Sequence, residues 1–182
     1  MRRWIATFFA TLLIGAVMST DAAALDPENT LYLELKTGRV TIVMRPDIAP
    51  NHVKRIKELV RQGFYDGLTF HRVIEGFMAQ TGDPRGDGTG GSGENIAAEF
   101  NKMEGFYRGT VGMARSSHPN SADSQFFIMF ERAEWLDGQY TIWGEVVDGI
   151  EHIMSIKRGA PGSGVVNDPD KIVSMKIAAD VK

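Results

Sequence analysis

The chain has 182 residues, of which 43 % are hydrophobic and 24 % charged, with a net charge of −3 and no cysteine. This length and composition suit one globular domain and exclude a disordered, coiled-coil or collagen-like chain. The lack of cysteine excludes disulfides and thiolate metal sites, and because no Lys/Arg-rich run stands out, we expect no nucleic-acid partner.

The first 24 residues have the pattern of a secretory signal peptide. Arg2 and Arg3 precede an apolar stretch over residues 4–17, and the alanines at 22–24 fit a small-residue cleavage site. An uncleaved anchor is the less favoured alternative, because a membrane-spanning helix needs about 20 apolar residues. We therefore expect cleavage near Ala24, a mature domain over residues 25–182 that is periplasmic or secreted, and no membrane association after cleavage.

The next segments predict a β-hairpin and a helix. Leu31, Leu33 and Leu35 alternate with polar residues, and a turn at Thr37-Gly38 leads into a β-branched run at 40–44. Residues 50–63 then begin with a proline and end with a glycine, as helices do. The apolar residues of this segment fall on one helical face: Val53, Ile56, Leu59 and Val60.

The rest of the chain predicts short strands and one more short helix. Residues 68–81 predict two strands with a bend at Glu75-Gly76, and 83–93 predict a loop; further strands are expected at 110–114, 125–129, 140–147 and 171–181. Asp148 is expected to cap a second helix with Glu151 as its partner, and Gly159 to end it. Because no βαβ rhythm occurs, the pattern predicts a mainly antiparallel barrel or sandwich, and it leaves both open.

The glycine-rich loop contains two short motifs that carry little weight. Gly86, Gly88 and Gly91 match a nucleotide-binding pattern, but no helix is predicted to follow them. The span from 83 to 94 has the spacing of a calcium loop, but Arg85 stands where an oxygen ligand is required. Neither ligand is expected.

The four histidines show neither a metal-ligand spacing nor a nucleophile motif. His118 lies in a serine-containing loop, which leaves a hydrolase as a weakly supported alternative. His52 and His152 lie in the two predicted helices, where we expect them to be exposed to solvent.

Three segments carry the functional information: FHRVIEGFMAQTGD at 70–83, SQFFIM at 124–129 and WLDG at 135–138. Taken singly, their phenylalanines could be core residues and Arg72 a surface residue. Together, however, their spelling, order and spacing resemble the cyclophilin family. The resemblance continues through GTGG at 88–91, GMA at 112–114 and WGEV at 143–146, and covers residues 29–180.

This resemblance implies a mainly β fold, namely a closed eight-stranded antiparallel β-barrel capped by two α-helices, with an active groove on its outer face. The catalytic residues that it implies are Arg72, Gln80 and Phe127. The substrate-binding residues that it implies are Phe77, Met78, Ala114, Arg115, Trp135, Leu136 and Tyr140. No metal and no organic cofactor are implied.

The sequence departs from the family pattern at a few positions. Arg115 stands where many relatives have asparagine, Tyr140 where they have histidine, and Thr81 where glycine is commoner, and the loop over 115–118 is one residue longer than in shorter relatives. Tyr140 still offers a hydroxyl, so loss of activity is not implied. Trp135 favours binding of cyclosporin-like ligands, because relatives that bind them tend to carry it.

The residue types suit rotation about an X-Pro bond. This reaction breaks no bond and needs no net proton transfer, so an acid–base pair is unnecessary; a tight hold on the ring and stabilisation of the twisted amide suffice. We therefore expect a monomeric peptidyl-prolyl cis-trans isomerase that acts on proline-containing, unfolded or flexible exported polypeptides. The alternative is a chaperone or adaptor module that binds proline segments with incidental turnover. The joint presence of Arg72, Gln80 and Phe127 favours the enzyme.

Overall fold

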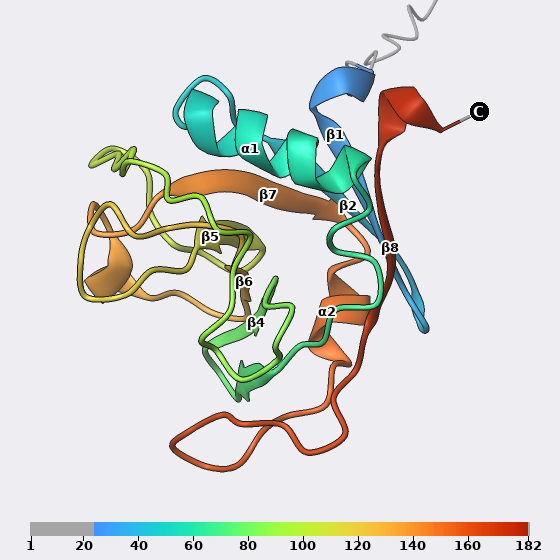
Figure 1. Cartoon of the computed structure of the whole chain (residues 1–182), viewed down its shortest axis with the longest axis vertical. Helices are drawn as coiled ribbons and strands as arrows, with labels where there is room; N and C mark the ends of the chain where they lie inside the picture. The colour runs from blue at the N-terminus through green and yellow to red at the C-terminus, as the bar shows by residue number, and fades with distance from the viewer. Residues whose placement is uncertain (1–23, 182) are drawn as a thin grey trace, which may run out of the picture.

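The computed structural model describes residues 24–181, so the predicted signal peptide lies outside the described residues except for Ala24. Eight antiparallel strands form one strongly curled sheet in the order β3-β4-β6-β5-β7-β2-β1-β8 (Figure 1). The strands are β1 (Thr30–Leu35), β2 (Gly38–Met44), β3 (Arg72–Ile74), β4 (Met78–Thr81), β5 (Thr110–Met113), β6 (Phe126–Met129), β7 (Ile142–Asp148) and β8 (Ile172–Ile177). The α-helices are α1 (Pro50–Arg61) and α2 (Ile150–Met154). None of the described helices is long and apolar enough to cross a bilayer.

The sheet is a curled half-barrel, and the expectation of a closed barrel was wrong on this point. Its two end strands, β3 and β8, share no ladder in the described part of the chain. The segment just before β3 meets the start of β8 through the isolated bridge between Thr69 and Lys171 and a few backbone hydrogen bonds around it. The outer edge of β3 is instead taken by the loop before β8, because Val73 N–H donates to the carbonyl of Gly164 at 2.7 Å. This loop keeps β8 from pairing with β3.

The main core fills the inner face of the curled sheet. Side chains alternate between the two faces of a strand, so Val73, Ala79, Val111 and Ile128 all point inward and are fully buried. Helix α1 lies across the upper end of the sheet in Figure 1, and α2 lies lower, beside β8. The apolar face of α1 closes the core, where each buried Leu or Ile contributes about 1.5–3 kcal/mol.

The local expectations hold for the first elements but not for α2. The β1–β2 hairpin and α1, which begins at Pro50, are confirmed. The predicted cap at Asp148 is wrong, because Asp148 still pairs with Thr41 as the last residue of β7. Gly149, with φ of 78°, makes the turn into a helix of five residues that ends at Met154 rather than near 159. Strand β8 likewise ends at residue 177 and gives way to a 3-10 turn instead of continuing to 181.

His52 is buried, which contradicts the expected solvent exposure. Its Nδ1 lies 2.6 Å from Glu99, whose carboxylate also accepts the backbone N–H groups of Asn51 and His52 at 3.0 Å each. Ala49 offers no side-chain cap at the start of α1, so Glu99, from a distant loop, caps this helix instead. Burial lowers the pKa of His52 despite the nearby carboxylate, and the ring is therefore neutral at pH 7.

His152 was also expected to be exposed, but its side chain is only 26 % exposed and its ring lies against Gly38. The position of this glycine has no room for a Cβ atom because of that ring. Both helical histidines thus belong to packed interfaces rather than to solvated faces.

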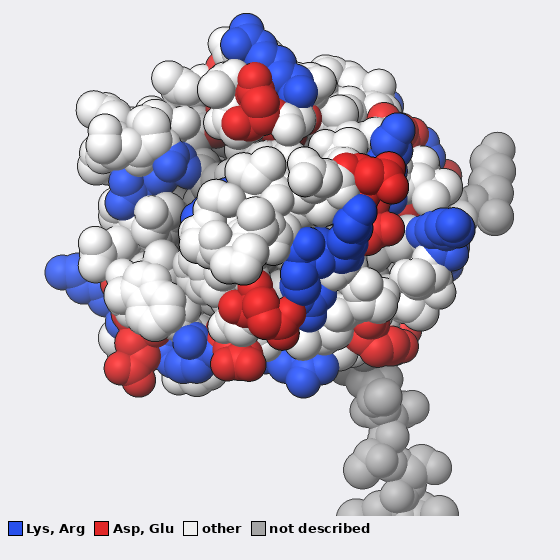
Figure 2. All heavy atoms as spheres, turned by 90° about the horizontal axis from the view of Figure 1, so that it is seen from below, with Lys and Arg blue, Asp and Glu red and all other residues white. Residues whose placement is uncertain are grey.

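Charged side chains of both signs are interspersed on the lower face of the molecule (Figure 2). Ion pairs such as Arg158–Glu75 at 2.5 Å join different segments of the chain. Pairs at this degree of exposure contribute at most about 1 kcal/mol each, so the fold depends mainly on its apolar core.

Candidate active site

A single row of residues crosses the outer face of the sheet. Arg72 lies opposite Gln80, Gln80 opposite Phe127, and Phe127 opposite Gly112, on strands β3, β4, β6 and β5. Residues directly opposite one another in a sheet point to the same face. The register therefore brings together Arg72, Gln80 and Phe127, which are separated by up to 55 positions in the sequence. It places their side chains on the side away from the main core.

Two hydrogen bonds orient the guanidinium of Arg72. Its Nη1 donates to Oε1 of Gln80 at 3.1 Å, and its Nε donates to the carbonyl of Ser163 at 3.3 Å. Within residues 24–181, no carboxylate forms an ion pair with Arg72. Because guanidinium has five N–H donors, several remain available to a ligand, together with an uncompensated positive charge.

An apolar cluster lies beside this charge on the same face. Met78, Phe127 and Leu136 are almost fully buried in it. The rings of Phe77 and Trp135 lie 5.7 Å apart above the cluster, and Trp135 itself is 63 % exposed. The cluster thus forms a cup with an aromatic rim.

Gly112 makes room for the floor of the cup. The rings of Phe106 and Phe127 stack 5.7 Å apart, and both lie close to this glycine. A Cβ atom at position 112 would lie 2.5 Å from Phe106 and 2.6 Å from Phe127, so any larger residue would clash with both rings.

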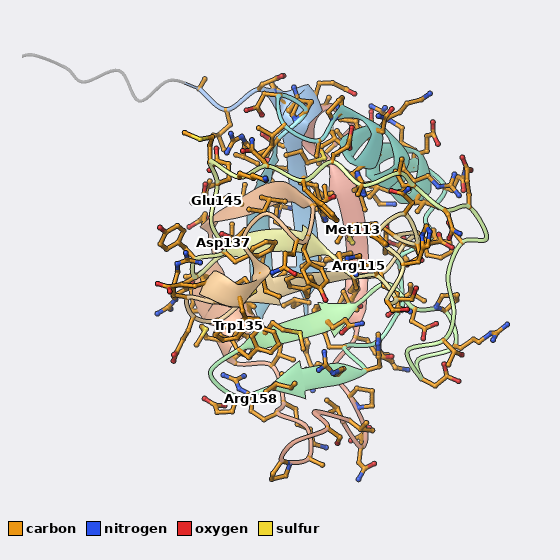
Figure 3. The ribbon with its side chains drawn as sticks, turned by 90° about the vertical axis from the view of Figure 1, so that its left-hand side faces the viewer. Met113, Arg115, Trp135, Asp137, Glu145 and Arg158 are labelled. Carbon is orange, nitrogen blue, oxygen red and sulfur yellow. The ribbon has the colours of Figure 1, made fainter. Side chains whose placement is uncertain are left out.

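The cup and the guanidinium share one cavity of about 360 Å³, a typical size for a ligand site. The cavity is lined by all ten residues that the sequence predicted for the site: Arg72, Phe77, Met78, Gln80, Ala114, Arg115, Phe127, Trp135, Leu136 and Tyr140. Gln139 also lines it and was not predicted. A second cavity of about 300 Å³ lies next to it and shares Gln80, Ala114 and Arg115 as a common wall. Arg115 and Trp135 can be followed in Figure 3.

Arg115 and Tyr140, the two departures from the family pattern, contact each other at the edge of the cavity. The guanidinium lies 4.4 Å from the centroid of the Tyr140 ring, a cation–π distance. It also donates to the carbonyls of Gln139 at 3.0 Å and Ser116 at 2.9 Å. Arg115 therefore ties the longer loop over 115–118 to the segment that carries Tyr140.

Sequence reasoning missed three polar groups around the site: Gln125, Gln139 and the carbonyl of Ser163. The oxygen and the nitrogen of the Gln125 side-chain amide both form hydrogen bonds, and the oxygen accepts from Gln80 at 2.8 Å. Its position could have been a signal, because in a strand a residue two places before Phe127 points to the same face.

The glycine-rich loop is organised around the carboxylate of Asp83. The buried carboxylate of Asp83 accepts the backbone N–H groups of Arg85 at 2.8 Å and Gly88 at 2.6 Å. Burial alone would raise the pKa of Asp83, but these N–H donors outweigh it and lower the pKa. Among the residues that the structure describes, no group of three or more potential metal ligands occurs.

Comparisons with known proteins identify the family of this chain. Residues 30–177 match the family described as cyclophilin type peptidyl-prolyl cis-trans isomerase/CLD. A probable peptidyl-prolyl cis-trans isomerase of Brucella suis is 53 % identical over 190 aligned positions, which cover 97 % of this chain and 95 % of the relative. A cyclophilin of Hirschia baltica superposes with a TM-score of 0.78 at 29 % identity, over 87 % of this chain and 77 % of the other.

A cyclophilin-type isomerase of Cryptosporidium parvum, solved in the presence of the dipeptide Ala-Pro, superposes with a TM-score of 0.74 at 28 % identity, over 81 % of this chain and 98 % of the other. Because the family match spans most of its length, this chain belongs to the cyclophilin family. Its activity is that of a peptidyl-prolyl cis-trans isomerase.

Proposed function

We propose that this isomerase accelerates rotation about X-Pro bonds in unfolded or flexible exported polypeptides and thereby assists their folding. One observation carries the proposal: the charge of Arg72, unpaired with any carboxylate of residues 24–181, lines the same cavity as the apolar cup of Phe77, Met78, Phe127 and Leu136. The cavity thus combines an apolar binding surface for the proline ring with a hydrogen-bond donor for the imide nitrogen.

The barrier to be lowered is the amide resonance of the X-Pro bond. Without a catalyst the bond rotates in about 10–100 s, over a barrier near 20 kcal/mol. When the bond twists, the proline nitrogen loses its conjugation, becomes pyramidal and gains a basic lone pair. A donor that meets this nitrogen binds the twisted state better than the planar one, and such differential binding is what raises kcat.

Each part of the cavity has a role in this scheme. Phe77, Met78, Phe127 and Leu136 hold the pyrrolidine ring and exclude water from it. The Arg72 guanidinium supplies the charged donor, while Gln80 and the Ser163 carbonyl hold its direction in advance. A rate gain of five decades would require about 7 kcal/mol, which ring clamping, desolvation and one charged hydrogen bond can supply together.

The substrate class follows from the same cavity. The Cryptosporidium parvum relative was solved with Ala-Pro present, which supports a proline-containing peptide as the ligand of the corresponding groove here. Ala114 and Arg115 line both cavities, and we expect them to contact residues next to the proline.

An isomerase assay on residues 25–182 tests the activity. We expect turnover of a proline tetrapeptide, measured by protease coupling or by NMR exchange, and a kcat that varies less than about twofold between pH 6 and 8, because a guanidinium stays charged there. A steep sigmoid in that window would point to a histidine-dependent mechanism and would contradict the scheme.

The proposal of exported clients depends on the N-terminal leader. Its basic start, its apolar stretch and the alanines at 22–24 support secretion. Expression of the full chain in a Gram-negative host, followed by fractionation and N-terminal sequencing, tests this. We expect a periplasmic protein that begins near residue 25; a cytoplasmic protein that retains its first 24 residues would refute it.

A further inference from the structure

A chain of hydrogen bonds continues beyond Arg72 and Gln80 to the glycine-rich loop. Gln80 Nε2 donates to Oε1 of Gln125 at 2.8 Å. Gln125 Nε2 in turn donates to the carbonyl of Gly88 at 3.1 Å and to that of Gly90 at 2.8 Å. The catalytic guanidinium is thereby connected through two side-chain amides to backbone groups of a distant loop.

The chemistry at the two ends allows only one direction for this chain. A guanidinium has donors and no acceptor, so the Gln80 amide must turn its oxygen toward Arg72 and its nitrogen toward Gln125. At the other end stand two carbonyls, which accept only, so Gln125 must turn its nitrogen toward the loop. If the Gln125 amide were flipped, its nitrogen would face the amide nitrogen of Gln80, and its oxygen would face the carbonyl oxygens of the loop. The loop carbonyls therefore select the orientation in which Gln80 accepts from Arg72.

The far end of the chain is firmly held. The buried Asp83 carboxylate fixes the N–H of Gly88 at 2.6 Å. It also lies so close to Gly90 that no Cβ atom would fit at that position. The two carbonyls that accept hydrogen bonds from Gln125 thus belong to a loop segment whose backbone conformation is fixed by a buried charge and by close packing.

We propose that Gln125 is a positioning residue for this isomerase: it acts through Gln80 and holds the Arg72 guanidinium in the direction needed at the twisted bond. The inference rests on the proposed role of Arg72. It predicts that loss of the Gln125 amide lowers kcat more than substrate affinity. Gln125 lines the second cavity, but its amide oxygen and nitrogen are already hydrogen-bonded to Gln80 and to the loop carbonyls.

A double-mutant cycle tests this on residues 25–182. Gln125→Met removes the amide while retaining a side chain of similar length, and we expect kcat to fall about three- to tenfold, with KM changed less than twofold. Gln80→Met should lower kcat at least as much. If Gln125 acts only through Gln80, the double variant should match Gln80→Met within about twofold. Gln62→Met makes the same change at an exposed position at the end of α1 and should leave both constants unchanged.

Several results would overturn the proposal. These are an unchanged kcat in Gln125→Met, a raised KM with kcat retained, and a loss in the double variant that equals the product of the single losses. Gln125→Leu repeats the test if the methionine variant does not fold.

A second readout needs no turnover. The Nε–Hε NMR signal of Arg72, which donates to Ser163 in the wild type, should shift or broaden in Gln125→Met and Gln80→Met but not in Gln62→Met. An unmoved signal in Gln125→Met would refute the positioning role. Absence of turnover in the wild type would instead refute the proposed function, and this signal would still decide the role of Gln125.

Discussion

Replacement of Arg72 by alanine is the most direct perturbation of the proposed mechanism. The structure shows a half-buried guanidinium whose charge meets no carboxylate of residues 24–181 and whose Nη1 and Nε contact Gln80 and Ser163. The change removes one charged hydrogen bond to the twisted imide, worth about 1.5–3 kcal/mol. Since 1.36 kcal/mol corresponds to a tenfold change in rate, kcat should fall by about one to two decades.

The protease-coupled assay measures this loss, and titration with the same peptide measures binding. KM should change less than about threefold, because the apolar cup that holds the proline ring remains in place. Arg72→Lys should recover only part of the rate, since an ammonium cannot bridge Gln80 and Ser163 as a planar guanidinium does. Arg108→Ala, which removes an exposed guanidinium from the turn before β5, is the matched control. Equal kcat in wild type and Arg72→Ala, or an equal loss in Arg108→Ala, would refute the assignment of Arg72.

Three further predictions concern the glycine beneath the cup, the cap of α1 and the aromatic rim of the cavity. Gly112→Ala should destabilise the fold by about 1–3 kcal/mol in urea denaturation and lower kcat/KM, because the new methyl group displaces the Phe127 ring; unchanged values of both would contradict this. Glu99→Gln should cost about 1–3 kcal/mol at pH 7, since it weakens the cap of α1. The pKa of Glu99 lies below its ordinary value of 4.5, burial being outweighed by its hydrogen bonds. The cost should therefore be complete above about pH 4.5 and shrink at lower pH, and a gap that stays constant down to pH 3 would show that the charge is irrelevant. Trp135→Ala should weaken binding of a cyclosporin-like ligand at least about tenfold in calorimetry, whereas Trp135→Phe should lose less; equal affinities would exclude the indole as a contact.

Much of the fold and of the candidate site could be predicted from the sequence because the signals are local. Strict alternation of Leu31, Leu33 and Leu35 defines one buried face of a strand, and Pro50 marks the first turn of a helix. The segment over 70–83 places Arg72 and Gln80 eight residues apart around a glycine bend, which is enough to make them cross-strand neighbours in a hairpin. The ten site residues came instead from the resemblance to one family, and all of them line one cavity.

The remaining features depend on groups that meet only in three dimensions. The sequence near His52 reads as an exposed helical surface, and only the approach of Glu99, 47 positions away, buries the ring and caps the helix. The sheet stays open because a loop occupies the edge of β3, an outcome that no strand pattern encodes. The polarity of the amide chain through Gln125 likewise depends on two carbonyls more than 30 positions away. Periodicity reports which face of an element is apolar, whereas hydrogen-bond partners and sheet edges are decided by which distant backbone groups remain unpaired once the chain has folded.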